Sequence, residues 1–177
     1  GSSPGRVRTI SAADCAAAIA DNAPASTMIV LAVKPQMMDD ALAAIGQLHD
    51  GKSAYLSIAA GISTSWLKQR LGSDAEVLRA MPNTPAAIGK GITALYADAS
   101  NAVCDLARQL LSAVGEVVIV DDEGLMDAVT AVSGSGPAYI FLLAEAMSAA
   151  GVKVGLPKAL ASELAKATVC GAGALMA

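Results

Sequence analysis

The sequence predicts an α/β fold, in which a layered sheet of strands and helices is followed by an all-helical region. Between Met28 and Val120, short apolar runs of strand length alternate with longer segments of helical pattern. After Val120 every remaining element has a helical pattern. The acidic stretch Asp121-Asp122-Glu123-Gly124 separates the two parts, so we expect a sheet domain over residues 1–121 and a helical domain over residues 122–177.

Each predicted strand is a short apolar run. A continuous run such as Met28–Val33 is typical of a strand that is buried on both faces of a parallel sheet. Lys34-Pro35 ends this run, and Pro82 ends the third one. The predicted strands are Met28–Val33, Ser53–Ile58, Val77–Met81, Ile92–Ala97 and Glu116–Val120.

Helices fill the intervals between these strands. Ser11 is suited to cap the first helix, and Asp14 places negative charge in its first turn, where the helix dipole favours it. Gly72 ends the helix that follows the second strand. The predicted helices of the sheet domain are Ala12–Ala20, Gln36–Leu48, Ser63–Leu71 and Ser100–Val114.

Three helices are predicted in the second domain: Leu125–Val132, Ala138–Ala150 and Pro157–Met176. Pro157 falls in a first turn, where its missing N–H costs nothing. Ser135 or Gly136 is expected to cap the middle helix, with Pro137 in its first turn. From Ala138 to Leu143 every residue is apolar apart from the hydroxyl of Tyr139, and a helix that is apolar all round is a buried one.

The composition favours an extensive subunit interface. Apolar residues make up 54% of the chain but aromatic residues only 3%, so the surplus is in small side chains that let helices approach closely. No apolar run approaches the ~20 residues that a spanning helix needs, so we expect no membrane partner. The net charge of −4 and the scattered basic residues argue against nucleic acid. We therefore expect a homo-oligomer.

The cysteines indicate the compartment. Cys15, Cys104 and Cys170 are few, odd in number and without C-x-x-C spacing, which is typical of a reducing compartment and predicts a cytoplasmic protein. His49 is the only histidine and lies beside Asp50-Gly51, so no Ser/His/Asp or Cys/His arrangement can be built around it. No metal-ligand cluster is present in the sequence pattern, and we expect no metal.

Four loops that follow strand ends form the candidate site, because ligands of open α/β sheets bind outside the carboxyl ends of the strands. Lys34 could reach a phosphate or ribose, or be an ordinary exposed lysine. Ala59-Ala60-Gly61 would let a flat ring approach the backbone, or be a tight turn. The loop Met81–Pro85 holds Asn83 and Thr84 between two prolines, for a ligand or as a stiff connection. Glu123 could bind a substrate N–H or solvate an acidic loop.

The stretch Gly134-Ser135-Gly136-Pro137 is not a dinucleotide-binding turn. A G-x-G-x-x-G pattern needs a glycine where the chain has Tyr139, and the stretch follows a helix rather than a strand. The glycines instead permit a neighbouring backbone or a ligand to approach closely.

Several stretches in this order resemble the pyrroline-5-carboxylate reductases. The matching stretches are AVKP (Ala32–Pro35), SIAAG (Ser57–Gly61), RAMPNTPA (Arg79–Ala86), DAVTAVSGSGPAY (Asp127–Tyr139) and AGVKVGLP (Ala150–Pro157). RAMPNTPA and SGSGPAY are the specific ones, and together the matches cover almost the whole chain.

The resemblance implies a Rossmann-type NAD(P)-binding domain followed by an all-α dimerisation domain, similar to the C-terminal domain of 6-phosphogluconate dehydrogenase. It implies NADPH or NADH as cofactor, reduction of 1-pyrroline-5-carboxylate to L-proline, and a homodimer or higher oligomer formed through the C-terminal helices. The cofactor-binding residues would be Ala32, Val33, Lys34, Pro35, Ile58, Ala59, Ala60, Asn83 and Ser3. The substrate-binding residues would be Glu123, Ser133, Gly134, Ser135 and Gly136.

Two features of the family are expected outside the printed sequence. Its Gly-rich turn would precede Gly1, and its S-P-G-G-T-T-like loop, with a catalytic threonine, would follow Ala177; the 177 residues alone are then expected to be inactive. One alternative is a related β-hydroxyacid dehydrogenase, although Lys153 and Lys158 fall past the helix that carries the catalytic lysine there. The other is a dimerising fragment without activity.

Overall fold

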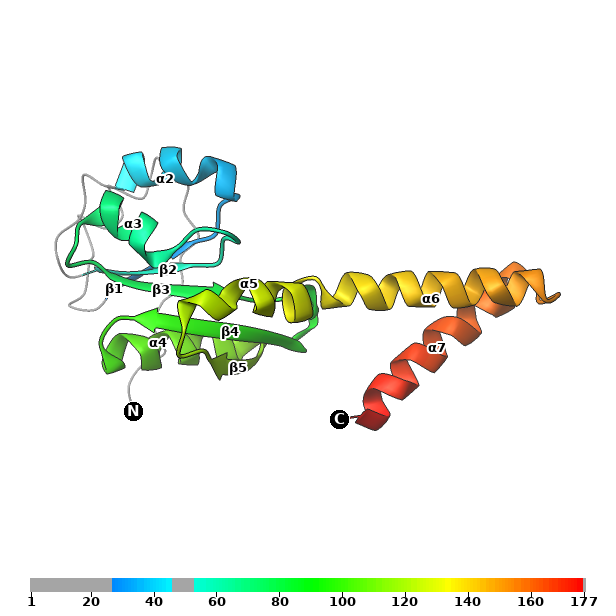
Figure 1. Ribbon diagram of the computed structural model, residues 1–177. Coiled ribbons are helices and arrows are strands. Elements are labelled where there is room, and N and C mark those ends of the chain that lie inside the picture. The colour runs from blue at the N-terminus through cyan, green and yellow to red at the C-terminus, as the bar shows by residue number, and fades with distance from the viewer. Residues whose placement is uncertain (1–26, 46–52, 177) are drawn as a thin grey trace.

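The computed structural model describes residues 27–45 and 53–176, which form a five-stranded sheet, helices on both of its faces and a helical arm (Figure 1). The strands lie in the order of the sequence: β1 (Thr27–Leu31), β2 (Ser53–Ser57), β3 (Glu76–Met81), β4 (Gly91–Asp98) and β5 (Gly115–Ile119). The five predicted strands are thus confirmed to within two residues at either end. The predicted helix Ala12–Ala20, together with Ser3, Cys15 and His49, lies outside the described residues.

The sheet is mixed: the first apolar run does form a parallel strand, but not every strand is parallel to its neighbour. β1, β2 and β3 are parallel, but β4 is antiparallel to β3, and β5 is parallel to β4. The connection over residues 82–90 contains only the short 3-10 helix η3 (Thr84–Ile88), whereas a parallel crossover needs about a dozen residues or more. β5 therefore runs opposite to β1–β3, and its last residue, Ile119, lies level with Ala80 of β3 through Leu95 of β4.

Two apolar clusters cover the two faces of the sheet. α2 (Met38–Ile45), which follows the 3-10 turn η1 (Pro35–Met37), and α3 (Thr64–Leu71) pack on one face, where Tyr55 and Val77 are fully buried. α4 (Asn101–Leu111), followed by η4 (Ser112–Val114), packs on the other, over Leu56 and Leu78. Successive residues of a strand point to opposite faces, so Val77, Arg79 and Met81 share the face of α3.

A single long helical stretch leads out of the sheet domain. It begins with η5 (Glu123–Leu125), continues through α5 (Met126–Val129) and a π-helical turn, η6 (Thr130–Gly134), and ends with α6 (Gly136–Lys153). Ser135 does not cap α6: its backbone is right-handed helical, and its side chain makes no capping hydrogen bond. The predicted helix start is confirmed in position, since α6 begins at Gly136 with Pro137 in its first turn; what the sequence did not predict is the π turn just before it, closed by Ser135 N–H donating to Thr130 O at 2.8 Å.

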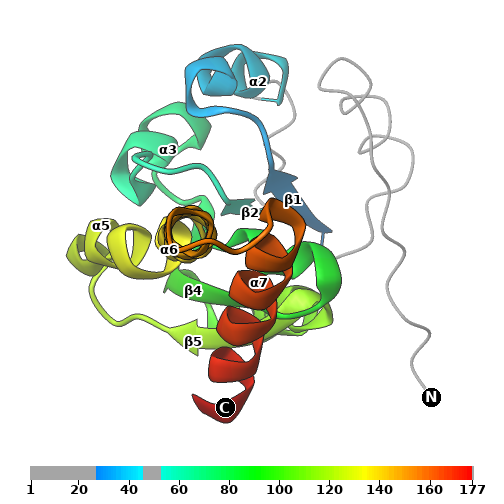
Figure 2. The same ribbon diagram turned by 90° about the vertical axis from the view of Figure 1, so that its right-hand side faces the viewer.

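α6 projects away from the sheet, and α7 (Lys158–Met176) folds back against α6 (Figures 1 and 2). The two helices meet where their side chains are small: a Cβ at Gly151 would lie 3.1 Å from the Cβ of Ala161. α6 has no buried residue, and Phe141 and Leu142 are about two-thirds exposed. An all-apolar helix was expected to be buried, and within this single chain it is not. Among the described residues, no helix could span a bilayer.

The first residues of β4 and β5, Gly91 and Gly115, face each other, and their close approach requires glycine. Gly115 has φ +148°, in a region that only glycine occupies comfortably, and a Cβ there would lie 2.0 Å from the carbonyl oxygen of Gly91. The main chain itself thus excludes a side chain at this position.

We therefore expect Gly115→Ala to lower the free energy of unfolding by about 3–5 kcal/mol, from backbone strain plus steric overlap. Gly89→Ala is the matched control, since Gly89 also has positive φ (+70°) but has open space at its Cβ position; it should cost only about 1–2 kcal/mol. Urea unfolding of both variants measures the difference, and equal losses would contradict the steric argument.

Candidate functional site

The loops that follow β1 and β2 lie side by side. Leu31 pairs with Ser57 at the ends of the two parallel strands, and Ile58 N–H donates to Leu31 O at 3.2 Å just beyond them. Ala32 and Ala60 are exposed, whereas Ala59 is buried, with its N–H donated to Ser57 Oγ at 3.3 Å. The two predicted cofactor loops, Ala32–Pro35 and Ile58–Ala60, thus form one surface of backbone and small side chains.

The second loop leads directly into the capped start of α3. Gly61 has φ +74°, which turns the chain, and Ser63 caps the helix by accepting a hydrogen bond from Trp66 N–H at 3.1 Å. The small side chains of these two loops are Ala32, Ala59 and Ala60, and a flat, weakly polar ring could lie against them. The surface therefore fits the nicotinamide cofactor expected from the sequence, and Lys34 is exposed beside it.

Asn83 ties the β3–β4 connection to the helical arm. Its Oδ1 accepts from Ile92 N–H at 3.0 Å, and its Nδ2 donates to Ser133 O over a longer 3.4 Å. The sequence left open whether Asn83 serves a ligand or a stiff connection. The structure shows the second role, and the predicted cofactor contact of Asn83 stays a prediction.

The segment Ser133–Gly136 lies where the π turn crosses the end of β3. A Cβ at Gly134 would lie 3.3 Å from Met81 Sδ, so glycine allows the close crossing. The hydroxyl of Ser133 is buried and has no hydrogen-bond partner among the described residues. Tyr139 Oη donates to the carbonyl of Ala131, 3.0 Å away, within the π turn. A buried hydroxyl without a partner at an irregular helical turn is a feature that suits ligand binding.

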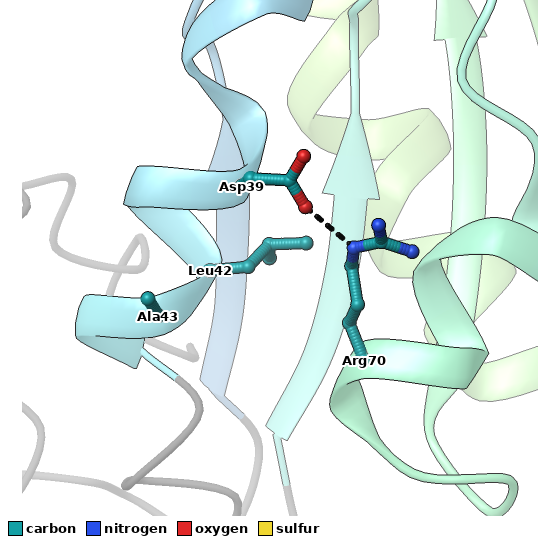
Figure 3. A pocket seen from close by; sticks show the side chains of 4 residues that line it. All are labelled: Asp39, Leu42, Ala43 and Arg70. Atoms are coloured by element: carbon teal, nitrogen blue, oxygen red, sulfur yellow. Dashed lines mark hydrogen bonds and ion pairs between the residues drawn. The ribbon is translucent and has the colours of Figure 1, made fainter.

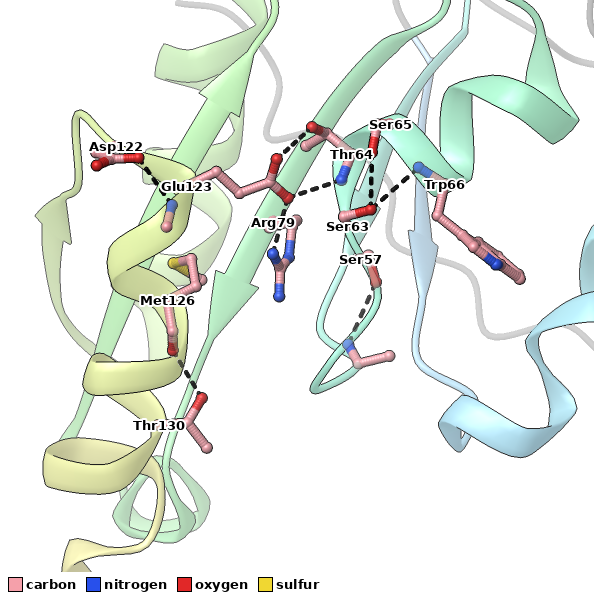
Figure 4. A network of polar contacts seen from close by, with 12 residues as sticks. Ser57, Ser63, Thr64, Ser65, Trp66, Arg79, Asp122, Glu123, Met126 and Thr130 are labelled. Carbon is pink, nitrogen blue, oxygen red and sulfur yellow. Dashed lines mark hydrogen bonds and ion pairs between the residues drawn. The ribbon is translucent and has the colours of Figure 1, made fainter.

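Glu123 sits in a network rather than in an exposed acidic loop (Figure 4). Its Oε1 accepts from Thr64 N–H and from Arg79 Nη1, both at 2.7 Å, and its Oε2 accepts from the Thr64 hydroxyl at 2.6 Å. The side chain of Arg79 is only 8% exposed and that of Glu123 23%. One carboxylate therefore joins the first residue of α3, the middle of β3 and the start of the helical arm.

The network keeps Glu123 ionised. Burial acts to raise the pKa of this carboxyl, but the hydrogen bonds from Thr64 and Arg79 and the positive charge of Arg79 outweigh burial, so the pKa lies below its ordinary value. Tyr96, which pairs with Arg79 across β3 and β4, has a raised pKa, first because of burial and then because of the negative charges of Asp98, Glu123 and Asp122.

The structure separates two groups of residues that the sequence placed in one substrate site. Glu123 and Ser133 are ten residues apart along a helical stretch, a rise of about 15 Å. Both Glu123 oxygens already have protein partners. The predicted substrate contacts of Glu123 and of Ser133–Gly136 both stay predictions.

Arg79 and Thr64 have no role in the sequence-based prediction, although Arg79 opens the RAMPNTPA stretch. A signal was present: Arg79 is the only charged residue in the run Val77–Met81. A charge inside an apolar strand needs a buried partner, which the sequence cannot identify because Glu123 is 44 residues away.

A second arginine–carboxylate pair lies outside this site (Figure 3). Arg70 Nε donates to Asp39 Oδ1 at 2.7 Å beside a pocket between α2 and α3 that Leu42 and Ala43 also line. The guanidinium of Arg70 also stacks over Trp66, 3.5 Å from the ring centroid. None of the predicted site residues lines this pocket. The residues that the structure describes contain no cluster of three metal-ligating side chains.

Comparison with known proteins identifies the family. Residues 123–177 match the family described as "Pyrroline-5-carboxylate reductase dimerisation". The pyrroline-5-carboxylate reductase of Pseudomonas aeruginosa is 48% identical over 89% of this chain, which spans 57% of that protein.

Solved structures agree. A pyrroline-5-carboxylate reductase from Coxiella burnetii has a TM-score of 0.77 at 36% identity, over 84% of this chain and 56% of that one. The Plasmodium falciparum enzyme, solved with NADP bound, has a TM-score of 0.75 at 32% identity, over 81% and 55%. The chain thus spans little more than half of each relative, and over that part it belongs to the pyrroline-5-carboxylate reductase family.

Proposed function

We propose that this chain forms the central part of an enzyme that reduces 1-pyrroline-5-carboxylate to L-proline with NADPH or NADH. The observation that carries the proposal is the 48% identity to the P. aeruginosa reductase, over a stretch that includes both loops at the strand ends and the π turn. The β-hydroxyacid dehydrogenase alternative has no comparable support in sequence.

The loops Ala32–Pro35 and Ile58–Ala60 hold the cofactor in this proposal. Support comes from their adjacency, their small side chains and the NADP in the P. falciparum relative. The cofactor supplies the hydride, so the protein needs no nucleophile or metal of its own. Asn83 adds a contact from the β3–β4 connection, and Ser3 one from the part outside the described residues.

The segment Ser133–Gly136 faces the substrate. Its task is to orient the imine carbon toward the nicotinamide surface and to exclude water, which position and fit can accomplish without acid–base side chains. The buried Ser133 hydroxyl is available as a donor or acceptor for the substrate. Gly136 has open space at its Cβ position, whereas Gly134 allows the turn to pass close to Met81.

The enzyme assembles as a homodimer through α6 and α7. Support comes from the match of residues 123–177 to the dimerisation family and from the exposed apolar side chains of α6. We further propose that it acts in the cytoplasm, as three cysteines without paired spacing suggest.

A chimera tests the activity directly. In it, this chain replaces the matching portion of the P. aeruginosa reductase, so that the remaining parts are those of a working enzyme. We expect the chimera to oxidise NADPH with 1-pyrroline-5-carboxylate within about tenfold of the parent kcat/KM, a difference of about 1.4 kcal/mol. A folded, dimeric chimera that is inactive, or one that acts only on 3-hydroxyacids, would overturn the proposal.

The dimer is tested by sedimentation of the 177-residue chain. We expect a dimer at micromolar concentration, and Phe141→Glu should convert it to monomer because a charge would replace an apolar contact at the interface. Ile88→Glu is the matched control: Ile88 is 74% exposed, compared with 67% for Phe141, but lies in η3. If the unsubstituted chain sediments as a stable monomer, the helices are not the interface.

The stability of the chain should depend on pH through Glu123. Because the folded pKa is depressed, the stabilisation is fully present above the ordinary value of 4.5 and is lost as the pH falls through the folded pKa. At pH 7 Glu123→Gln should cost about 1.5–3 kcal/mol, since Arg79 loses a charged partner. This difference from the unsubstituted chain should shrink below the ordinary pKa.

Urea unfolding at a series of pH values measures this effect. Asp122→Asn is the control, because Asp122 is an exposed carboxylate that accepts only from the N–H of Gly124, at 2.8 Å. Curves for Glu123→Gln and the unsubstituted chain that stay parallel down to acid pH would show that the Glu123 pKa is not depressed.

A further inference from the structure

We propose that Arg79 is a positioning residue of the active site, which acts through Glu123 to fix where the helix bearing Ser133–Gly136 crosses the sheet. The proposal rests on the proposed function only in taking Ser133–Gly136 as the segment that faces the substrate. Neither Arg79 nor Glu123 needs to touch the substrate in this role.

Stability alone accounts poorly for Arg79. Its side chain is 8% exposed, its Nη1 donates to Glu123, and its Nε has no partner among the described residues. Replacing a buried ion pair by apolar residues is often neutral or stabilising, so a pair with an unused donor is not the most stable choice here. What the pair does provide is a fixed direction, because a guanidinium binds a carboxylate in a defined plane.

The geometry of β3 also supports the positioning role. Arg79 and Met81 are two residues apart on β3 and so face the same side of the sheet. Arg79 holds Glu123 at the start of the helical arm, and Met81 packs under Gly134. One strand thus fixes the helix at two points about 15 Å apart, which determines both its direction and its rotation.

The same carboxylate also holds the start of α3. Glu123 also accepts from the N–H and hydroxyl of Thr64, the first residue of α3, which follows the loop Ile58–Ala60. Glu123 is therefore shared between the two segments that the proposed function assigns to cofactor and substrate. Arg79, beneath both, supplies the positive charge that the shared carboxylate requires.

The other charged and titratable groups near this pair come from α3, β4 and the loop before η5. Lys68 pairs with Asp98 at 2.6 Å, and Tyr96 interacts electrostatically with Asp98, Glu123 and Asp122. None of them donates a hydrogen bond to Glu123. We therefore expect removal of Arg79 to change the position and pKa of Glu123 more than removal of any of these groups would.

The test uses the chimera described above, with Arg79→Met, Arg79→Lys and the control Arg70→Met. Arg70 makes the same type of contact, at the same 2.7 Å, to Asp39 outside the site. We expect Arg79→Met to raise the KM for pyrroline-5-carboxylate by about tenfold or more, with the KM for NADPH within about twofold. Arg79→Lys should restore most of the loss and Arg70→Met should change neither constant. A purely structural role would lower the active fraction, hence kcat, and leave both KM values unchanged.

Two further readouts separate the alternatives. If Arg79 acts through Glu123, then Arg79→Met, Glu123→Gln and the double variant should have similar effects, whereas additive effects would mean that Arg79 binds substrate directly. The acid limb of kcat/KM should also move to higher pH in Arg79→Met, because the Glu123 pKa rises when the guanidinium is removed. An unmoved limb together with an unchanged KM would overturn the proposal.

Hydrogen exchange keeps the test valid if the proposed function fails. Should the unsubstituted chimera be inactive, amide exchange in the 177-residue chain is compared between Arg79→Met and Arg70→Met. We expect faster exchange over residues 126–136 only in Arg79→Met, or in Arg79→Lys to a smaller degree if the methionine variant does not fold. Unchanged exchange over these residues would rule out the positioning role irrespective of the reaction catalysed.

Discussion

A guanidinium buried in the middle of the sheet is the constraint on which the arrangement of this molecule depends. Taking the charge of Arg79 out of water costs of the order of several kcal/mol, so a carboxylate must reach it through the layer that covers β3. Glu123 does so from 44 residues away, and Thr64 donates both its N–H and its hydroxyl to the same carboxylate. The helix that follows Glu123 therefore cannot slide along the sheet without exposing one charge or stranding the other.

The reversal of strand direction at β3–β4 makes this pairing possible. The prolines of the connection leave room only for a short 3-10 turn, so β4 and β5 run back toward the start of β3. The chain leaves β5 at Ile119, level with Ala80 of β3 through Leu95 of β4. The helical stretch that begins at Glu123, beside Arg79, then continues along β3 until Gly134 lies against Met81.

Much of the fold follows from local signals, whereas the site depends on long-range pairing. The apolar runs predict all five strands, and Ser63 and Gly72 bound α3 as expected because capping is a local interaction. Strand direction was not predictable from apolar runs, which look alike in both directions. The π turn was missed because Gly134-Ser135-Gly136-Pro137 reads locally as a helix start, and only the crossing over Met81 shows why the helix widens there. The role of Glu123 required its partner Arg79, which only the fold brings near.

The same helical stretch connects the segment Ser133–Gly136 to the exposed apolar side chains of α6. From Glu123 to Lys153 the chain consists of successive helical segments with a single bend residue, Ser135, so the two attachments to β3 influence the direction in which α6 leaves the sheet as well as the place of Ser133. The exposed apolar side chains begin only a turn beyond that segment, at Tyr139 and Phe141. In the proposed dimer, a second copy that covers them would also approach the turn proposed to face the substrate. The charge pair of Arg79 and Glu123 would then orient the subunit interface and the site together, because both lie on one helical stretch.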